Sequence, residues 1–279
     1  MSTARDHYTE HRPCSIDEYH ADTDHDSPSS LSLFRASPKL YYHRRITGKL
    51  PTPEPTREML VGTATHTAIL EPELIDDLFA VPPAAVLASD GSRRGKAYDA
   101  WADQAAKLIV TQAEADAIRW MIDAVHAHPV ASRYLAAREH AEYSLFWRDE
   151  TVAGKARFDA LSSADRWFMD LKTTSDPGPA WSRRAARLGV HCQAAWYSDG
   201  FRRHFGVRPT VLHVVVGSTP PYDCVCWTLD SEAIREGAQE NARTVAALRA
   251  CLEGRRPWLH ELSHSINTLP WTKGQGQWR

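Results

Sequence analysis

Two aspartates and a lysine in the middle of the chain have the types and spacing that metal-dependent phosphodiester chemistry needs. Asp170 and Lys172 follow Asp159 after ten intervening residues, and each group lies in a stretch of alternating apolar and polar residues. Successive side chains of a β-strand point to opposite faces, so Asp159 shares a face with Lys155 and Arg157, and Asp170 shares one with Lys172. The polar residues between the two stretches predict a hairpin loop. Pairing of the strands would gather both carboxylates and the lysine on one face.

This group of residues suits the hydrolysis of a phosphodiester bond. Mg²⁺ takes carboxylate oxygens, waters and substrate phosphate, so two aspartates are enough to hold it. A metal bound there would polarise the phosphate and lower the pKa of a bound water, while Lys172 would orient the water or neutralise the developing charge. Lys155 and Arg157 would lie beside Asp159, where a phosphate must sit. An Asp-x-Lys pattern also occurs on solvated hairpins, so these residues alone leave an ordinary surface hairpin open.

Further short motifs follow one another along the chain. They are Ser37-Pro38 with Tyr41-Tyr42, and the segments 62–66, 70–73, 93–96, 142–147, 154–159, 170–174 and 191–197. In the order and spacing of these motifs, residues 31–229 resemble the PD-(D/E)xK nuclease superfamily. Within it they resemble the C-terminal nuclease domain of RecE-type exodeoxyribonuclease VIII and, more distantly, lambda-type exonucleases. The resemblance implies an α/β fold with a restriction-endonuclease-like core, in which helices flank a central mixed β-sheet.

The resemblance also implies a set of metal ligands. His66 would be a ligand on a helix, Asp159 and Asp170 the metal-binding carboxylates, and Leu171 the donor of a backbone carbonyl. Lys172 would be the catalytic lysine, and the cofactor would be Mg²⁺, with Mn²⁺ as a substitute. Small residues one turn before His66 would let its helix approach the sheet closely, although a single histidine on a helix is more often structural.

Four further residues are weaker candidates for the site. Gln193 and Tyr197 match a Gln-x-x-x-Tyr element of the family, and their spacing places both on one side of a helix, facing the site or the DNA backbone. Glu71 would be an acid near the metal or a helix-end residue. Asp149 resembles an acidic position of the lambda-type enzymes, with an ordinary turn aspartate as the alternative. The chain departs from the family at Phe158, where proline often stands, but no functional group is lost.

Composition limits the class of protein. The 279 residues are 43% hydrophobic, which is enough for one substantial core. There is no run of eighteen apolar residues and no hydrophobic N-terminal stretch, so we expect no membrane span and a cytoplasmic protein. Five scattered cysteines without a Cys-x-x-Cys pair argue against a disulfide framework, a zinc ribbon or an iron–sulfur cluster.

The charge balance first looks unsuited to DNA, because 33 basic residues face 35 acidic ones. Residues 1–30 hold seven of the acids and two of the basic residues, so the rest of the chain is slightly basic. Binding of phosphate would then depend on local clusters. The candidate clusters are Arg44-Arg45 with Lys49, Arg93-Arg94 with Lys96, Arg183-Arg184 with Arg187, and Arg202-Arg203.

The order of predicted elements gives the domain organisation. Residues 1–30 are polar and rich in His, Asp and Ser, and we expect them to be disordered or loosely attached; residues 31–279 would form a single nuclease domain with a C-terminal helix and tail. Helices are predicted from residue 31, over 58–70, from the capping box at Thr111 to Pro129, over 180–205, and from Ser231 to Gly254. Strands are predicted over 143–147, 155–161, 167–172, 210–216 and 223–229. Trp258, Trp271 and Trp278 in the tail are expected to pack on the domain, with stacking on bases or on another subunit as the alternative.

Together these features favour a magnesium-dependent exodeoxyribonuclease that acts on double-stranded DNA. Only phosphodiester hydrolysis is argued from the residues themselves. A 5′-to-3′ polarity, a role in homologous recombination, a prophage origin, a ring-shaped homo-oligomer and a single-strand annealing protein as partner are implied by the resemblance. The alternatives are a single-strand exonuclease or structure-selective endonuclease of the same superfamily, a non-catalytic DNA-binding module, and a protein–protein adaptor. Against the binding module, Asp159, Asp170 and Lys172 are all present.

Overall fold

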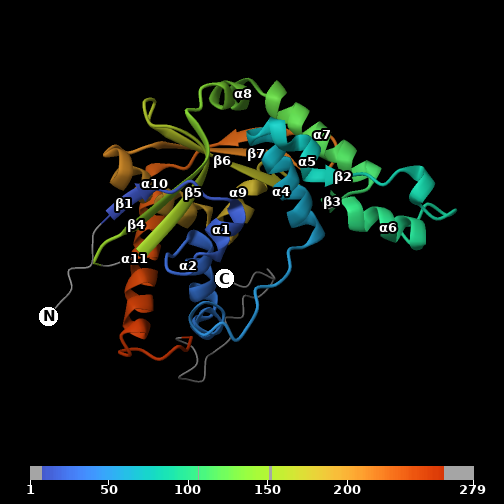
Figure 1. Ribbon diagram of the computed structural model, residues 1–279. Coiled ribbons are helices and arrows are strands. Elements are labelled where there is room, and N and C mark those ends of the chain that lie inside the picture. Colours follow the sequence, from blue (N-terminus) through green and yellow to red (C-terminus); the bar gives the residue numbers. More distant parts are fainter. Residues whose placement is uncertain (1–7, 106, 151–152, 261–279) are drawn as a thin grey trace, which may run out of the picture.

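A six-stranded mixed sheet forms the centre of the computed structural model, which describes residues 8–105, 107–150 and 153–260 (Figure 1). The strand order is β1-β4-β5-β6-β7-β8; β6 and β7 are parallel, and the other neighbours are antiparallel. The strands are β1 (Tyr8–His11), β4 (His140–Arg148), β5 (Ala153–Ser162), β6 (Trp167–Thr174), β7 (Thr210–Gly217) and β8 (Cys224–Trp227). This architecture is the predicted mixed sheet flanked by helices.

Helices cover both faces of the sheet (Figure 1). Phe158 and Phe168 point to the face covered by α2, α10 and α11, whereas Met169 and Leu171 point to the face covered by α4, α7 and α8. The helices are α1 (Ile16–Ala21), α2 (Pro28–Ala36), α3 (Pro38–Tyr41), α4 (Arg57–Leu70), α7 (Gln112–Ala127), α8 (Pro129–Ala136), α9 (Trp181–Leu188), α10 (Val190–Phe205) and α11 (Ser231–Leu252). A π-helical turn, Tyr42–Ile46, continues α3.

The chain between α4 and α7 forms an extension that lies to one side of the main sheet in Figure 1. Its two short strands pair in parallel with each other and with no strand of the main sheet. The elements of the extension are the 3₁₀ turn Pro72–Leu74, α5 (Ile75–Leu78), β2 (Phe79–Ala80), the 3₁₀ turn Ala84–Val86, α6 (Lys96–Ala105) and β3 (Leu108–Ile109).

Local signals placed several helix ends correctly. The Thr111 side chain accepts from the Glu114 backbone amide, and the Glu114 carboxylate accepts from the Thr111 amide, so the predicted capping box is present at the start of α7. The predicted single helix over residues 180–205 is wrong, because Gly189 adopts a left-handed conformation (φ 70°) and separates α9 from α10.

The N-terminal segment differs most from the expectation of disorder. Residues 1–7 lie outside the described residues, but Tyr8–His11 forms an edge strand paired with β4. Ser15 caps α1 through a capping box, and Tyr19 in that helix is 5% exposed. The prediction of disorder is therefore wrong from Tyr8 onward, because the polar segment contributes backbone pairing and a few buried rings that its composition does not reveal. Of the tail tryptophans, Trp258 packs against Tyr41 as expected, and Trp271 and Trp278 lie outside the described residues.

Candidate active site

The central hairpin opens into a fork at the two predicted carboxylates. β5 and β6 pair only through Ala160–Met169 and the two residue pairs nearest the turn. Beyond that point β5 pairs with β4, and β6 pairs with β7. The next residues on the two strands are Asp159 and Asp170. Because the ladder has ended, the Leu171 amide is free to donate to Asp159 Oδ2 at 2.5 Å, so the fork itself fixes the first carboxylate.

A third acidic residue joins this fork. The β4–β5 ladder skips Glu142 and Asp159, between the pairs Ala141–Ala160 and Tyr143–Phe158. Glu142 has a positive φ of 50°, which is unusual for a residue other than glycine. This irregularity turns its carboxylate toward the site, so backbone strain lies beside the acidic cluster.

Helix α4 supplies the predicted histidine. His66 Nε2 lies 2.8 Å from Asp159 Oδ2, and His66 Nδ1 lies 3.3 Å from Glu142 Oε1. A Cβ atom on Gly62, one turn earlier, would lie 3.0 Å from Thr173 Oγ1, so α4 packs closely on β6 as the small residues predicted. One donor atom from each of His66, Glu142 and Asp159 falls within 4.8 Å of the others. One imidazole and two carboxylates are a donor set that fits a divalent metal ion.

Asp170 lies next to this group but outside it, and three side chains hold its carboxylate. Lys172 Nζ lies 2.6 Å and Gln193 Nε2 2.9 Å from Oδ1, while His213 Nδ1 lies 3.0 Å from Oδ2. His213 is on β7, directly paired with Asp170 in the parallel register, and is 2% exposed. Since a carboxylate is an acceptor, we assign the proton of His213 to Nδ1. The interactions orient Asp170 and bring Lys172 to the fork.

Opposite charges balance one another at the fork. Burial would lower the pKa of His66, but Asp159 and Glu142 outweigh burial and raise it to about 10. Burial raises the pKa of Asp159, with Asp170 adding to the effect and His66 opposing it. Although burial acts the other way, Lys172 holds the pKa of Asp170 well below its usual range, and Asp170 raises that of Lys172. A metal at the three-donor group would therefore replace the positive charge that the His66 proton supplies.

The Gln-x-x-x-Tyr pair faces the site from α10. Gln193 contacts Asp170 directly, as described above, whereas Tyr197 is 8% exposed and packs against Phe158 and Phe168. Burial, together with Asp159 and Asp170, raises the pKa of the Tyr197 hydroxyl. The neutral phenol is part of the core beside the carboxylates. The contacts of Gln193 and Tyr197 therefore support the site from the side of α10.

Of the two strand cations predicted beside the site, Arg157 reaches it and Lys155 does not. Lys155 is 2% exposed, and its ammonium donates to the backbone carbonyls of Tyr19 and Asp22. The prediction that Lys155 lies beside Asp159 and contacts DNA is wrong, because the N-terminal segment covers it. Arg157 does reach the site, but it pairs with Glu142 at 2.5 Å and donates to the Cys14 carbonyl, so it holds the acidic cluster.

The two weaker acidic candidates, Glu71 and Asp149, lie in different parts of the structure. Glu71 ends α4, and burial, followed by the charge of Glu142, raises its pKa. It therefore lies in the electrostatic surroundings of the fork without joining the three-donor group. Asp149 pairs with Arg203 on α10 at 2.6 Å, which links the end of β4 to α10, and it is not one of the three donors at the fork.

Sequence reasoning missed two residues of this site, Glu142 and His213. Glu142 begins one of the recognised motifs, but its role depends on an irregular ladder that no local pattern predicts. His213 is the one polar side chain in the otherwise apolar run from Val211 to Val216, and this interruption was the available signal.

The fold and the fork define a nuclease-like class of protein. The model of a family described as a PDDEXK-like domain of unknown function (DUF3799) matches residues 27–261, so the chain belongs to that family. Nucleases of this class typically use divalent metals, in keeping with the donor set above.

A similar solved structure is a crystal structure described as a "putative exonuclease" from Eubacterium rectale. It has a TM-score of 0.64 and 13% sequence identity, and the match covers 94% of this chain and 97% of that chain. At this identity the likeness supports the fold alone. Comparison with curated proteins gives no significant match. Among the described helices, none is long and apolar enough to cross a membrane.

Proposed function

We propose that this protein is a metal-dependent deoxyribonuclease, acting as a 5′-to-3′ exonuclease on double-stranded DNA. The observation that carries the proposal is the fork, where Asp159, Asp170 and Lys172 meet beside His66 and Glu142. A divalent metal held by His66, Glu142 and Asp159 would polarise a phosphodiester and activate a water. Lys172, 28% exposed and pointing to Asp170, can reach a phosphate and neutralise the charge that builds on it.

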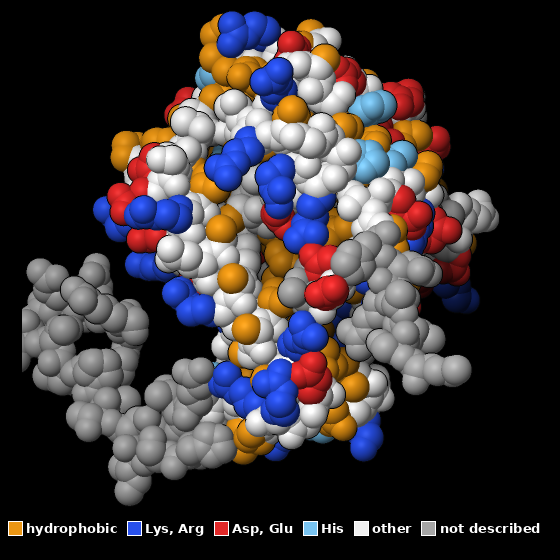
Figure 2. Space-filling model, turned by 90° about the vertical axis from the view of Figure 1, so that its left-hand side faces the viewer, with side chains coloured by type: hydrophobic (Ala, Val, Ile, Leu, Met, Phe, Trp, Pro, Cys, Tyr) orange, Lys and Arg blue, Asp and Glu red, His pale blue; other side chains and the backbone are white. Residues whose placement is uncertain are grey.

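An arginine cluster next to the fork supports a path for the DNA backbone. Thr174, two residues beyond Lys172 on the same face of β6, lines a cavity of about 350 Å³ together with Arg183, Arg184 and Arg187 of α9. Guanidinium groups can form bidentate hydrogen bonds with phosphates. On the face that Figure 2 shows, Lys and Arg side chains form separate groups among acidic and apolar ones. Local clusters, more than a general basic surface, would therefore guide the DNA.

Digestion of end-labelled DNA tests the proposal. Linear duplexes labelled at the 5′ or the 3′ end, and covalently closed circles, would be incubated with the protein and Mg²⁺, Mn²⁺ or chelator. We expect early release of the 5′ label, sparing of the circle, and loss of activity in Asp170→Asn. Asp149→Asn is the matched control, because it removes an equivalent charge outside the site.

The other outcomes separate the alternatives. Cutting of the circle would support phosphodiester hydrolysis but indicate an endonuclease in place of an exonuclease. Digestion of single strands alone would favour a single-strand exonuclease. Wild type that binds DNA yet leaves every substrate intact would favour a binding module. The ring-shaped oligomer, the annealing partner and the role in recombination remain parts of the proposal that rest on the resemblance, and light scattering of the purified protein tests the first of them.

A further inference from the structure

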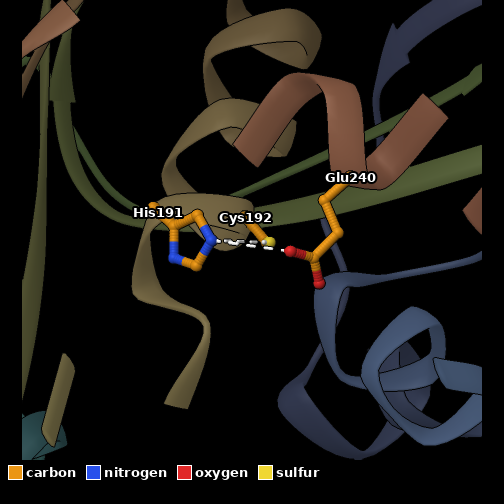
Figure 3. Close-up of side chains that lie close together, drawn as sticks. All are labelled: His191, Cys192 and Glu240. Carbon is orange, nitrogen blue, oxygen red and sulfur yellow. Dashed lines mark hydrogen bonds and ion pairs between the residues drawn. The ribbon is translucent and has the colours of Figure 1, made fainter. Parts of the chain in front are cut away.

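A second group of donor atoms lies at the junction of α10 and α11 (Figure 3). His191 and Cys192 belong to the first turn of α10, and Glu240 projects toward them from α11. Cys192 Sγ lies 3.4 Å from His191 Nε2, which lies 3.7 Å from Glu240 Oε2. Like the three donors at the fork, these atoms all fall within 4.8 Å of one another.

The chemistry of these donors differs from that of the fork. A thiolate and an imidazole are softer ligands than two carboxylates, and thiolate, imidazole and carboxylate are all ligand types that bind zinc. Ligands bound to one tetrahedral zinc at about 2.0–2.3 Å lie about 3.3–3.6 Å from one another, which is close to the separations observed here. The atoms are thus already near the spacing that a shared ion requires.

The surrounding contacts hold the three donors in place. A Cβ atom on Gly237 would lie 2.2 Å from the His191 carbonyl oxygen, so α11 touches the backbone of α10 at this point. Asn241 donates to the Cys192 carbonyl at 2.8 Å. Arg35 of α2 binds Glu240 Oε1 at 3.1 Å, which leaves Oε2 directed at His191. A partner that orients a ligating carboxylate in this way is typical of metal sites.

We propose that His191, Cys192 and Glu240 form a zinc site distinct from the metal site of the fork. Cys192 is 1% exposed, whereas the side chains of His191 and Glu240 are 23% and 37% exposed, so the site opens to solvent on one side. A water would complete the coordination from there. Cys192 would bind as a thiolate and release its proton to solvent. The ion would tie α10 to α11 next to Gln193, which holds Asp170.

Cobalt substitution tests this site independently of any nuclease activity. The full-length protein, reduced and freed of metal with a chelator, would be titrated with Co²⁺ while its absorption spectrum is recorded. We expect a thiolate-to-cobalt charge-transfer band whose final intensity corresponds to one thiolate-bound ion per chain and which disappears when Zn²⁺ is added. Cys192→Ser should abolish the band. The matched control is Cys251→Ser, which changes a buried cysteine on α11 outside the proposed site. It should leave the band unchanged.

Glu240→Gln provides a second test in case Cys192→Ser fails to fold, because the half-exposed side chain of Glu240 is not part of the core. It should weaken binding of Co²⁺ and Zn²⁺ by about tenfold or more and reduce the rise in unfolding temperature that Zn²⁺ causes in the wild type. Absence of the band in the wild type, its persistence in Cys192→Ser, or unchanged affinity in Glu240→Gln would overturn the proposal. Asp159→Asn should retain the band, so failure of this site and failure of the nuclease proposal are distinguishable.

Discussion

Replacement of His213 by leucine should impair the site more than the fold. His213 Nδ1 donates to Asp170 Oδ2 at 3.0 Å, and both side chains are almost fully buried. Leucine removes this hydrogen bond and leaves Asp170 with two partners on its other oxygen. It also removes His213 Nε2, a buried nitrogen that has no hydrogen-bond partner among the residues that the structure describes. The loss therefore falls mainly on the orientation of Asp170, which makes His213 a positioning residue.

The magnitude follows from the charge of the acceptor. A hydrogen bond to a charged group contributes about 1.5–3 kcal/mol. If most of that energy fixes the productive orientation of Asp170, the rate of hydrolysis falls by about 10- to 100-fold, since each 1.36 kcal/mol is about tenfold. His213→Asn is the informative partner variant, because its side-chain amide can donate from nearly the position of Nδ1 and should retain most of the activity.

Three measurements decide the result. The rate of digestion at saturating Mg²⁺ and the dependence on Mg²⁺ concentration would be compared for wild type, His213→Leu and His213→Asn, and thermal unfolding would report on the fold. We expect unfolding to change less than activity. Full activity in the leucine variant, or equal losses in both variants, would refute the positioning role of this hydrogen bond.

Three further perturbations follow from the described contacts. Lys172→Met should lower the rate of cleavage by about 10²- to 10³-fold, because an ammonium at the developing charge is lost; DNA binding in a gel shift should persist, and undiminished cleavage would exclude Lys172 from the chemistry. Gly154→Ala should destabilise the protein by about 1–3 kcal/mol, because its Cβ would lie 2.4 Å from Trp147 Cε2; an unchanged urea midpoint would contradict this. Hydrogen bonding to Arg57 lowers the pKa of Glu114 to about 2, from an ordinary 4.5, so this pair stabilises the fold above pH 4.5 and the contribution is lost as pH falls toward 2. Urea unfolding from about pH 3 to pH 7 should show Glu114→Gln less stable by about 1 kcal/mol at neutral pH, a value discounted for solvent screening, with the difference shrinking in acid; a constant difference would contradict the linkage.

Elements that depend on local signals were predictable from the sequence. The capping box at Thr111 placed the start of α7, and strand alternation placed β5 and β6 close to their observed bounds. Elements that depend on distant partners were not. The four-residue strand β1 has little apolar character of its own and is defined by its pairing with β4, more than 130 residues away. Composition alone therefore assigned the N-terminal segment to disorder.

Alternation also failed at one position inside the site. Phe158 and Leu161 belong to the core cluster on one face of the sheet, and Ala160 belongs to the other, so strict alternation is broken near Asp159. The break coincides with the skipped pair at Glu142. Strict alternation cannot represent such a break. The prediction from the sequence therefore placed Lys155, Arg157 and Asp159 on one face of the strand. The structure brings His66, Asp159, Asp170 and Lys172, the residues named by the resemblance, together at the fork, although periodicity alone did not arrange them.

The same break explains why a candidate site lies at this point of the sheet. A continuous ladder would pair every backbone amide with a neighbouring strand and leave none for a side chain. At the fork, the end of the β5–β6 ladder releases the Leu171 amide to Asp159, and the skipped pair turns Glu142 inward. The negative charges of the carboxylates then need positive partners. His66 pairs with Asp159, and Lys172 pairs with Asp170. Irregular pairing thus creates a cluster of oriented acids that regular pairing would forbid, and the fork is consequently where a divalent metal can be held between two otherwise ordinary strands.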